Sequence, residues 1–197
     1  MRLSRYLFVV TLFSGFLIWY WWEGTAIPIL TLGAILIHEG GHCVGALLCG
    51  VSLHEFRLVP WEARISLGTQ SLSYQKECFI SLAGPLANLL TFFLVKARGI
   101  SAVDGALSFF AAVSLSLALL NLLPINDFDG GRFFRCLCAA FFGLRVAEIL
   151  SDILSFLTLF CLWCASVYLI IRVNDNLSLF LFSGTLFLRI FIRRRSW

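Results

Sequence analysis

Long apolar segments follow one another along most of this chain, and they constrain its fold more than any other feature. Of the 197 residues, 60% are hydrophobic and 13% are charged, which is far from the balance of soluble globular domains. A helix of about 20 apolar residues crosses the hydrocarbon core of a bilayer. Because backbone polar groups in lipid must be satisfied within the protein, such segments form helices. The sequence therefore predicts an all-α polytopic membrane protein.

Six segments are candidate transmembrane helices. The first ends in an aromatic cluster typical of a membrane interface, and the last is the shortest. A cleaved signal peptide is the alternative for the first segment, but bulky Trp residues stand where a cleavage site needs small ones. We therefore expect a retained helix. The six segments are residues 6–22, 26–50, 78–95, 105–123, 147–171 and 177–192.

The basic residues predict the orientation of these helices. If residue 1 is cytosolic and all six segments span the membrane, then of the 15 Lys and Arg residues only Lys96, Arg98 and Arg172 face outward. This asymmetry follows the positive-inside rule, so both termini are expected in the cytosol. The cations lie at the ends of apolar segments rather than in one patch, so no nucleic-acid partner is expected.

Two connections have patterns of their own. Residues 51–74 alternate polar and apolar side chains, with Pro60 and Gly68 as turn residues, which predicts a short β-hairpin at the membrane surface between helices two and three. Residues 129–143 are too few to span a bilayer, so a short interfacial or re-entrant helix is expected there. Since no Gly/Ser-rich or Pro-rich linker divides the chain, we expect one domain over residues 1–197.

His38, Glu39 and His42 form an HEGGH motif inside the second apolar segment. On a helix, two imidazoles four residues apart share one face and can bind one zinc ion, with the glutamate beside the metal. Ionisable side chains at membrane depth cost free energy and usually mark a functional site. Glu39 is then the candidate general base of a hydrolysis. Gly40 and Gly41 each cost about 1 kcal/mol in a helix, which indicates close approach by a substrate or a neighbouring helix.

A hydrolytic zinc site commonly has three protein ligands and one open position for water. The candidate third ligand is Asp129, which follows Pro124 in the segment NLLPINDFDGG, and Asp127 is the fallback. Pro124 ends the fourth helix, and non-helical backbone at this depth needs protein or a hydrated cavity around it. We therefore expect Asp129 to fold back toward Zn²⁺, in a catalytic core of about residues 26–143.

Other polar or reactive side chains have simpler interpretations. Cys161 and Cys164 form a CxxC on a continuous apolar segment without a second pair, so packing is expected rather than metal binding. His54 lies in a connection and is expected to be solvated. Glu148 and Asp152 are expected near the membrane interface, where they favour the dipole at the start of the fifth helix.

Three motifs together resemble the site-2 proteases, the intramembrane zinc metalloproteases of peptidase family M50. HEGGH is similar to that family's HExxH, and residues 84–88, Gly-Pro-Leu-Ala-Asn, are similar to the glycine and asparagine motif of its third core helix. The family's NxxPxPxxDG is matched by Asn121, Pro124, Asp129 and Gly130, with Asn126 in place of the second proline.

This resemblance implies a zinc-binding core of three transmembrane helices in a bacterial cell membrane. It implies cleavage of a transmembrane or membrane-associated protein substrate, with Asn88 and Asn121 helping to position the substrate backbone. Interhelical hydrogen bonding is the alternative role for both asparagines. The closest resemblance is to the sporulation branch that processes pro-sigma factors, so release of a regulatory factor and a regulatory membrane partner are further expectations. Clearance of signal-peptide remnants is the alternative.

The same residues also permit a different function. A metal transporter or metal-binding membrane protein is the alternative, and a metal-free polar cluster is the alternative for HEGGH alone. A transporter should have polar residues along a path on both sides of the site, whereas the outer halves of the predicted helices are almost wholly apolar. The sequence therefore favours peptide hydrolysis within or near the membrane.

Overall fold

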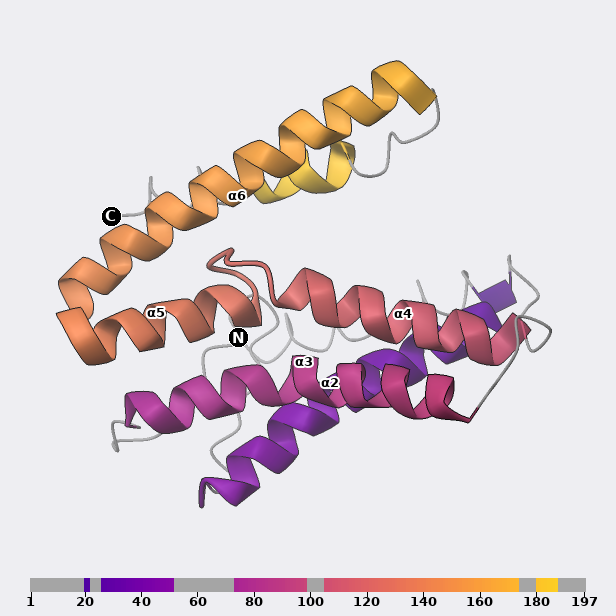
Figure 1. The fold of residues 1–197 in the computed structure, drawn as a ribbon, viewed down its shortest axis with the longest axis horizontal. Helices are drawn as coiled ribbons and strands as arrows, with labels where there is room; N and C mark the ends of the chain where they lie inside the picture. The colour runs from indigo at the N-terminus through magenta and orange to yellow at the C-terminus, as the bar shows by residue number, and fades with distance from the viewer. Residues whose placement is uncertain (1–19, 22–25, 52–72, 99–104, 174–179, 188–197) are drawn as a thin grey trace, which may run out of the picture. The chain divides into compact units, whose positions relative to one another are not determined.

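The computed structural model describes residues 20–21, 26–51, 73–98, 105–173 and 180–187. Within these ranges every regular element is a helix, as the all-α prediction requires. The elements are α2 (Ile27–Leu48), α3 (Tyr74–Ala97), α4 (Gly105–Asn121), α5 (Asp129–Phe142) and α6 (Leu144–Val173), followed by a short helix over residues 180–187 (Figure 1).

Three of the described helices, α2, α3 and α6, are long and apolar enough to cross a membrane. The fourth predicted span is present as α4, which has only 17 residues. The first predicted span lies almost wholly outside the described residues, as does most of the predicted hairpin, and half of the sixth predicted span lies outside them. At the end of that hairpin, the assignment of Tyr74 is wrong: it is the first residue of α3, after Ser73 in extended backbone (φ −60°, ψ 138°).

The chain divides into two compact units, Met1–Leu122 and Leu123–Trp197. The first unit contains α2, α3 and α4, and the second contains the connection after α4 together with α5 and α6. The structure defines the internal arrangement of each unit. That both units form one peptidase domain stays a prediction.

In the first unit, small residues allow α2 and α3 to approach closely. A Cβ atom at Gly41 would lie 2.6 Å from the carbonyl oxygen of Ala83, and one at Gly45 would lie 2.7 Å from the Cβ of Ala83. Such contacts are typical of helix pairs in membranes, where no hydrophobic force drives association. The expected close approach at Gly41 is therefore made by a neighbouring helix, whereas a Cβ at Gly40 would meet nothing within 4 Å.

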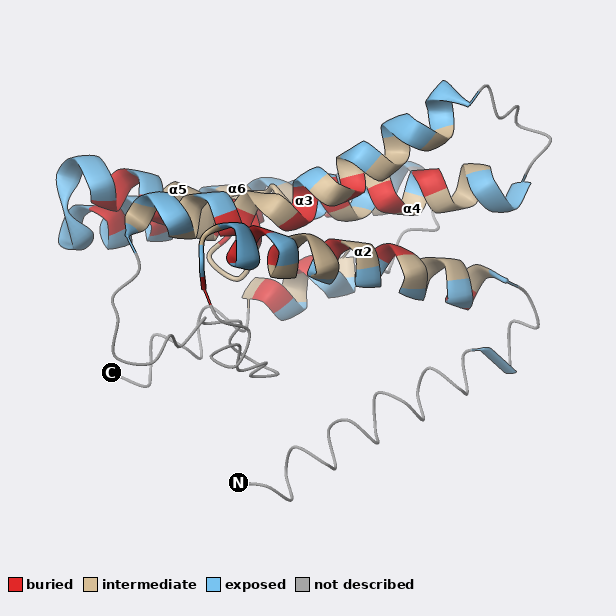
Figure 2. Cartoon of the chain, turned by 90° about the horizontal axis from the view of Figure 1, so that it is seen from below, coloured by how far each residue is buried: buried red, intermediate tan, exposed pale blue. Residues whose placement is uncertain are grey.

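In the second unit, a helix break leads into α5, and α5 is joined to α6 through Gly143, whose φ of 80° suits glycine. The predicted short helix over residues 129–143 is confirmed by α5, which has 14 residues. Ile125, Leu159 and Leu186 form the buried core of this unit. Figure 2 colours the residues by their burial, and many exposed residues of α6 are large and apolar, as expected of a helix that faces lipid.

Candidate metal centre

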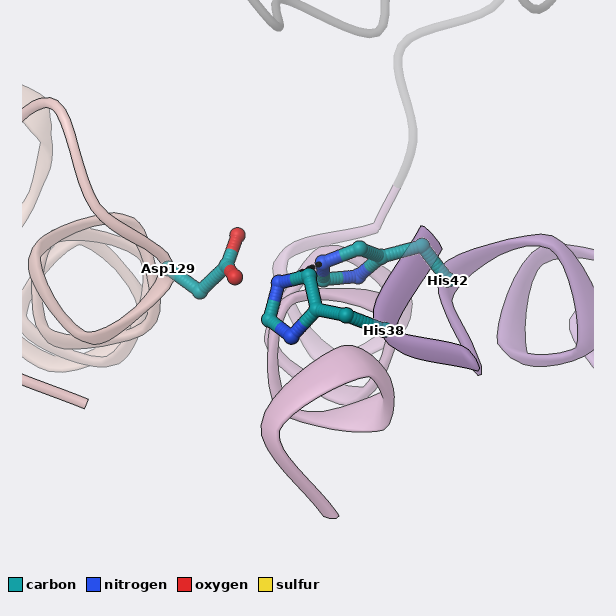
Figure 3. A group of neighbouring side chains, drawn as sticks. All are labelled: His38, His42 and Asp129. Carbon is teal, nitrogen blue, oxygen red and sulfur yellow. Dashed lines mark hydrogen bonds between the residues drawn. The ribbon is translucent and has the colours of Figure 1, made fainter. Parts of the chain in front are cut away.

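Helix α2 places His38 and His42 on one face, one turn apart (Figure 3). Both side chains are buried, with 6% and 8% of their surface exposed. Their rings meet edge to face, with centroids 4.9 Å apart at an interplanar angle of 85°. The two Nε2 atoms are 3.3 Å apart. The helix therefore aims two ring nitrogens at a common point.

Helix α3 holds the His42 ring from two sides. The Nδ1 of His42 lies 2.8 Å from the carbonyl oxygen of Ile80, and since a carbonyl can only accept, Nδ1 carries the proton and donates. The Nε2 of the neutral ring is then left with its lone pair. At Gly84, an added Cβ would lie 2.6 Å from the Cε1 of His42, so the absence of a side chain there makes room for the imidazole.

The contacts between α2 and α3 repeat at every turn. Asn88 reaches His38, with Nδ2 3.4 Å from Nδ1, and Gly84 lies against His42. Because residue numbers rise along α3 as they fall along α2, the two helices are antiparallel. Each step is four residues on both helices, the spacing of one helical face. The first and last residues of the Gly-Pro-Leu-Ala-Asn segment therefore lie beside the two histidines of HEGGH, in reverse order.

These donors fit a zinc ion. Two imidazole nitrogens bound to one tetrahedral zinc at about 2.0–2.1 Å lie about 3.3 Å from each other, and the two Nε2 atoms are separated by 3.3 Å. Metal-binding histidines usually donate the other ring N–H to a carbonyl or carboxylate, as His42 does to Ile80. The first unit thus places two candidate ligands in suitable positions.

Asp129 is the first residue of α5, after Phe128 in extended backbone (φ −106°, ψ 164°). Its side chain is buried and lies 4.0 Å from the Nη1 of Arg132, one turn later. The preceding turn is tight, since the N–H of Phe128 donates to Ile125 at 2.8 Å. A Cβ at Gly131 would lie 2.8 Å from the backbone nitrogen of Asn126. Figure 3 draws the Asp129 side chain together with the two histidines.

Polar side chains of α6 hold Asn126, three residues before Asp129. The N–H of Asn126 donates to the Oγ of Ser155 at 2.7 Å, its Nδ2 donates to the Oδ1 of Asp152 at 2.7 Å, and its Oδ1 accepts from Ser151. The expected helix-dipole role of Glu148 and Asp152 is wrong, because α6 begins at Leu144 and its first turn has no acidic residue. We call Asn126, Ser151, Asp152 and Ser155 together the Asn126 clamp.

The other predicted site residues have varied surroundings. Glu39 is exposed on α2, and Asp127 is half-buried in the turn before α5. Asn121 ends α4, where its Nδ2 donates to the carbonyl of Leu117 at 3.0 Å. His54 lies outside the described residues. Substrate positioning by Asn88 and Asn121 stays a prediction.

Sequence reasoning did not find the Ile80 carbonyl, the contact of Gly84 with His42, or the Asn126 clamp. The spacing of Gly84 and Asn88 equals that of His42 and His38, and this equality was a usable signal for the first two contacts. For the clamp, the signal was the close spacing of Ser151, Asp152 and Ser155 on a long, largely apolar helix.

Comparison with known proteins gives consistent matches. The family model described as Peptidase M50B-like matches residues 9–190. "Putative zinc metalloprotease Rip3" of Mycobacterium tuberculosis is 32% identical over 124 residues, which are 59% of this chain and 32% of the relative. "Putative zinc metalloprotease sll0528" of Synechocystis sp. is 27% identical over 123 residues, 58% of this chain and 32% of the relative. The matched region thus spans about a third of these curated relatives.

Proposed function

Because this chain belongs to the Peptidase M50B-like family, we propose that it is a zinc metallopeptidase that cleaves a protein substrate in or near a transmembrane or membrane-associated segment. Its three long apolar helices, together with the family, indicate a membrane protein. The observation that supports the activity most directly is the pair of Nε2 atoms of His38 and His42, 3.3 Å apart on a helix long enough to cross a membrane.

The proposed ligands are His38, His42 and Asp129, all of which are buried. Two imidazoles and a carboxylate form a ligand set typical of hydrolytic zinc sites, with one coordination position left open. When bound, the ion lowers the pKa of water and polarises the scissile carbonyl. The four-residue spacing of the histidines and the contacts of His42 with α3 hold two of these ligands before any substrate arrives.

Glu39 is the proposed general base. Its position next to His38 on α2 keeps it close to the proposed ligands, and its exposed side chain is not covered by other described residues. It takes the proton of the attacking water and later gives it to the leaving amine. The substrate must present extended backbone, since a helix keeps its carbonyl groups in internal hydrogen bonds.

The proposal includes a setting for this reaction. We place the protein in a bacterial cell membrane with both termini in the cytosol, and the substrate in the same bilayer. Release of a regulatory factor such as a pro-sigma factor, under the control of a regulatory membrane partner, remains part of the proposal. Both relatives are named as zinc metalloproteases, and neither name refers to sporulation.

The test uses the whole chain, purified in detergent for zinc analysis and co-expressed with tagged single-span membrane proteins for activity. We expect wild type to bind zinc and to produce fragments. Glu39→Gln should retain zinc while fragment formation falls about 10²–10⁴-fold, the usual contribution of a general base. Asp129→Ala should lose zinc, whereas the matched control Asp127→Ala should retain it.

Three results would contradict parts of the proposal. Equal fragment yields from wild type and Glu39→Gln would exclude Glu39 as the base. Zinc flux into proteoliposomes that is the same for wild type and Glu39→Gln, without any cleavage, would favour the transporter. Zinc retained by Asp129→Ala but lost by Asp127→Ala would exchange the roles of the two carboxylates.

A further inference from the structure

Asn88 has an environment that suits a task at the metal rather than at the substrate. Its side chain is completely buried, with 0% of its surface exposed. One end of the amide lies against His38, with Nδ2 3.4 Å from Nδ1. The other end, Oδ1, is buried without a hydrogen-bond partner. An acceptor in such a place costs free energy, so it requires an explanation.

The described contacts define one consistent set of protons without an ion. The amide N–H of Asn88 donates to Nδ1 of His38, so the single proton of the neutral ring is on Nε2. That Nε2–H donates to Nε2 of His42 at 3.3 Å. His42 in turn donates its Nδ1–H to Ile80. In this series of three hydrogen bonds, each donor therefore faces an acceptor.

Zinc binding requires a different distribution of these protons. His38 can bind an ion through Nε2 only if its proton lies on Nδ1. An Nδ1–H would then face the N–H of the Asn88 amide, donor against donor. A half-turn of the amide about its last torsion, which is soft, exchanges the two ends and presents Oδ1 as the acceptor. The ring keeps one proton, which moves from Nε2 to Nδ1 by exchange with water.

We propose that Asn88 is a positioning residue for the metal ligand His38. With the ion bound, Oδ1 of Asn88 accepts the Nδ1–H of His38 and holds its Nε2 toward the metal, as Ile80 does for His42. Without the ion, the same amide is turned and donates to Nδ1. This inference rests on the proposed zinc site and deepens it.

The first test measures zinc affinity by competition with a chelator, using the purified full chain, and needs no substrate. Asn88→Leu keeps the approximate shape of the side chain and removes the acceptor, so its affinity should fall about 10–100-fold. Asn88→Asp keeps an acceptor in the same place, so it should bind zinc nearly as well as wild type. Ser81→Ala is the matched control, because Ser81 is also buried on α3 with an unpartnered oxygen, and its affinity should not change.

The outcomes separate this inference from the proposed function. Wild-type affinity in Asn88→Leu, or an equal loss in Asn88→Asp and Asn88→Leu, would overturn the role of Asn88 and leave the zinc site intact. A wild-type chain that binds no zinc would overturn both.

A second measurement does not depend on how the variants fold. The chain has three histidines, so ¹⁵N-histidine NMR of the His54→Gln protein reports on His38 and His42 alone. We expect His38 to carry its proton on Nε2 without zinc and on Nδ1 with zinc, while His42 keeps its proton on Nδ1 throughout. If His38 has the Nδ1 proton in both states, the proposed half-turn of the Asn88 amide is wrong.

Discussion

At the scale of single residues, Gly84 decides whether the His42 ring has room. A Cβ at this position would lie 2.6 Å from Cε1 and 2.8 Å from Cδ2 of His42, closer than side chains tolerate. The ring cannot simply move aside, because its Nδ1–H is donated to the Ile80 carbonyl on the same helix. A helix-favouring change at Gly84 should therefore disturb the site.

Gly84→Ala should reduce zinc affinity by at least about tenfold, the lower end of the effect expected when the support of a metal ligand is disturbed. The measurement is chelator competition on the purified chain. Gly33→Ala is the control, because its Cβ would meet only the ring of Phe110 at an ordinary 3.6 Å, and its affinity should match wild type. An unchanged affinity in Gly84→Ala would show that the ring is not confined as described.

At the scale of elements, α6 has the length and composition of a membrane helix, and its side chains also form hydrogen bonds to the turn between α4 and α5. The turn after α4 has no helical hydrogen bonds for Asn126, and unsatisfied backbone groups are costly at membrane depth. Ser155 supplies an acceptor for the N–H of Asn126 and donates to the carbonyl of Pro124 at 3.4 Å. The Asn126 clamp thus steadies the turn that leads to Asp129, at the position where the family motif has a proline.

Removing this clamp should destabilise the chain. Asn126→Ala leaves the Ser151 hydroxyl buried without its acceptor, so we expect a loss of about 1–3 kcal/mol in the free energy of unfolding, measured by SDS titration in mixed micelles. Ser151→Ala should be non-additive with Asn126→Ala, since each removes the same bond. Thr158→Ala is the control, because the Thr158 hydroxyl bonds its own helix, and it should add independently. Additivity in both pairs would contradict the clamp.

At the scale of the whole molecule, the predicted arrangement across the bilayer rests on the positions of the basic residues. Among the described helices, α2, α3 and α6 have the length and composition of spans, and Lys96 with Arg98 lie at the end of α3. The six-helix prediction requires this end of α3 to face outward and both termini to face the cytosol.

Reporter fusions test that arrangement. Green fluorescent protein joined after residue 197 should be fluorescent, and alkaline phosphatase at the same place should be inactive, because one folds in the cytosol and the other needs the oxidising exterior. Fusions after residue 100 should show the opposite result. If the two junctions behave alike, the number of spans between them is even, and the six-helix arrangement is wrong.

Sequence alone determined the features that depend on short stretches of chain. HEGGH on a helix implies two histidines on one face, because that geometry is set within one turn, and Pro124 followed by polar residues implies a break before a short helix. Apolar length predicted the helices, although α3 begins at Tyr74, earlier than expected, and most of the hairpin predicted for residues 51–74 lies outside the described residues.

Only the tertiary structure decided which groups support the site. The carbonyl of Ile80 has no sequence signature, since every residue has one, and its contact with His42 joins residues 38 positions apart. In the same way, the side chain of Asn126 is hydrogen-bonded by residues of α6 that are more than 20 positions away. Such contacts result from packing between helices, which the local periodicity of one helix does not specify.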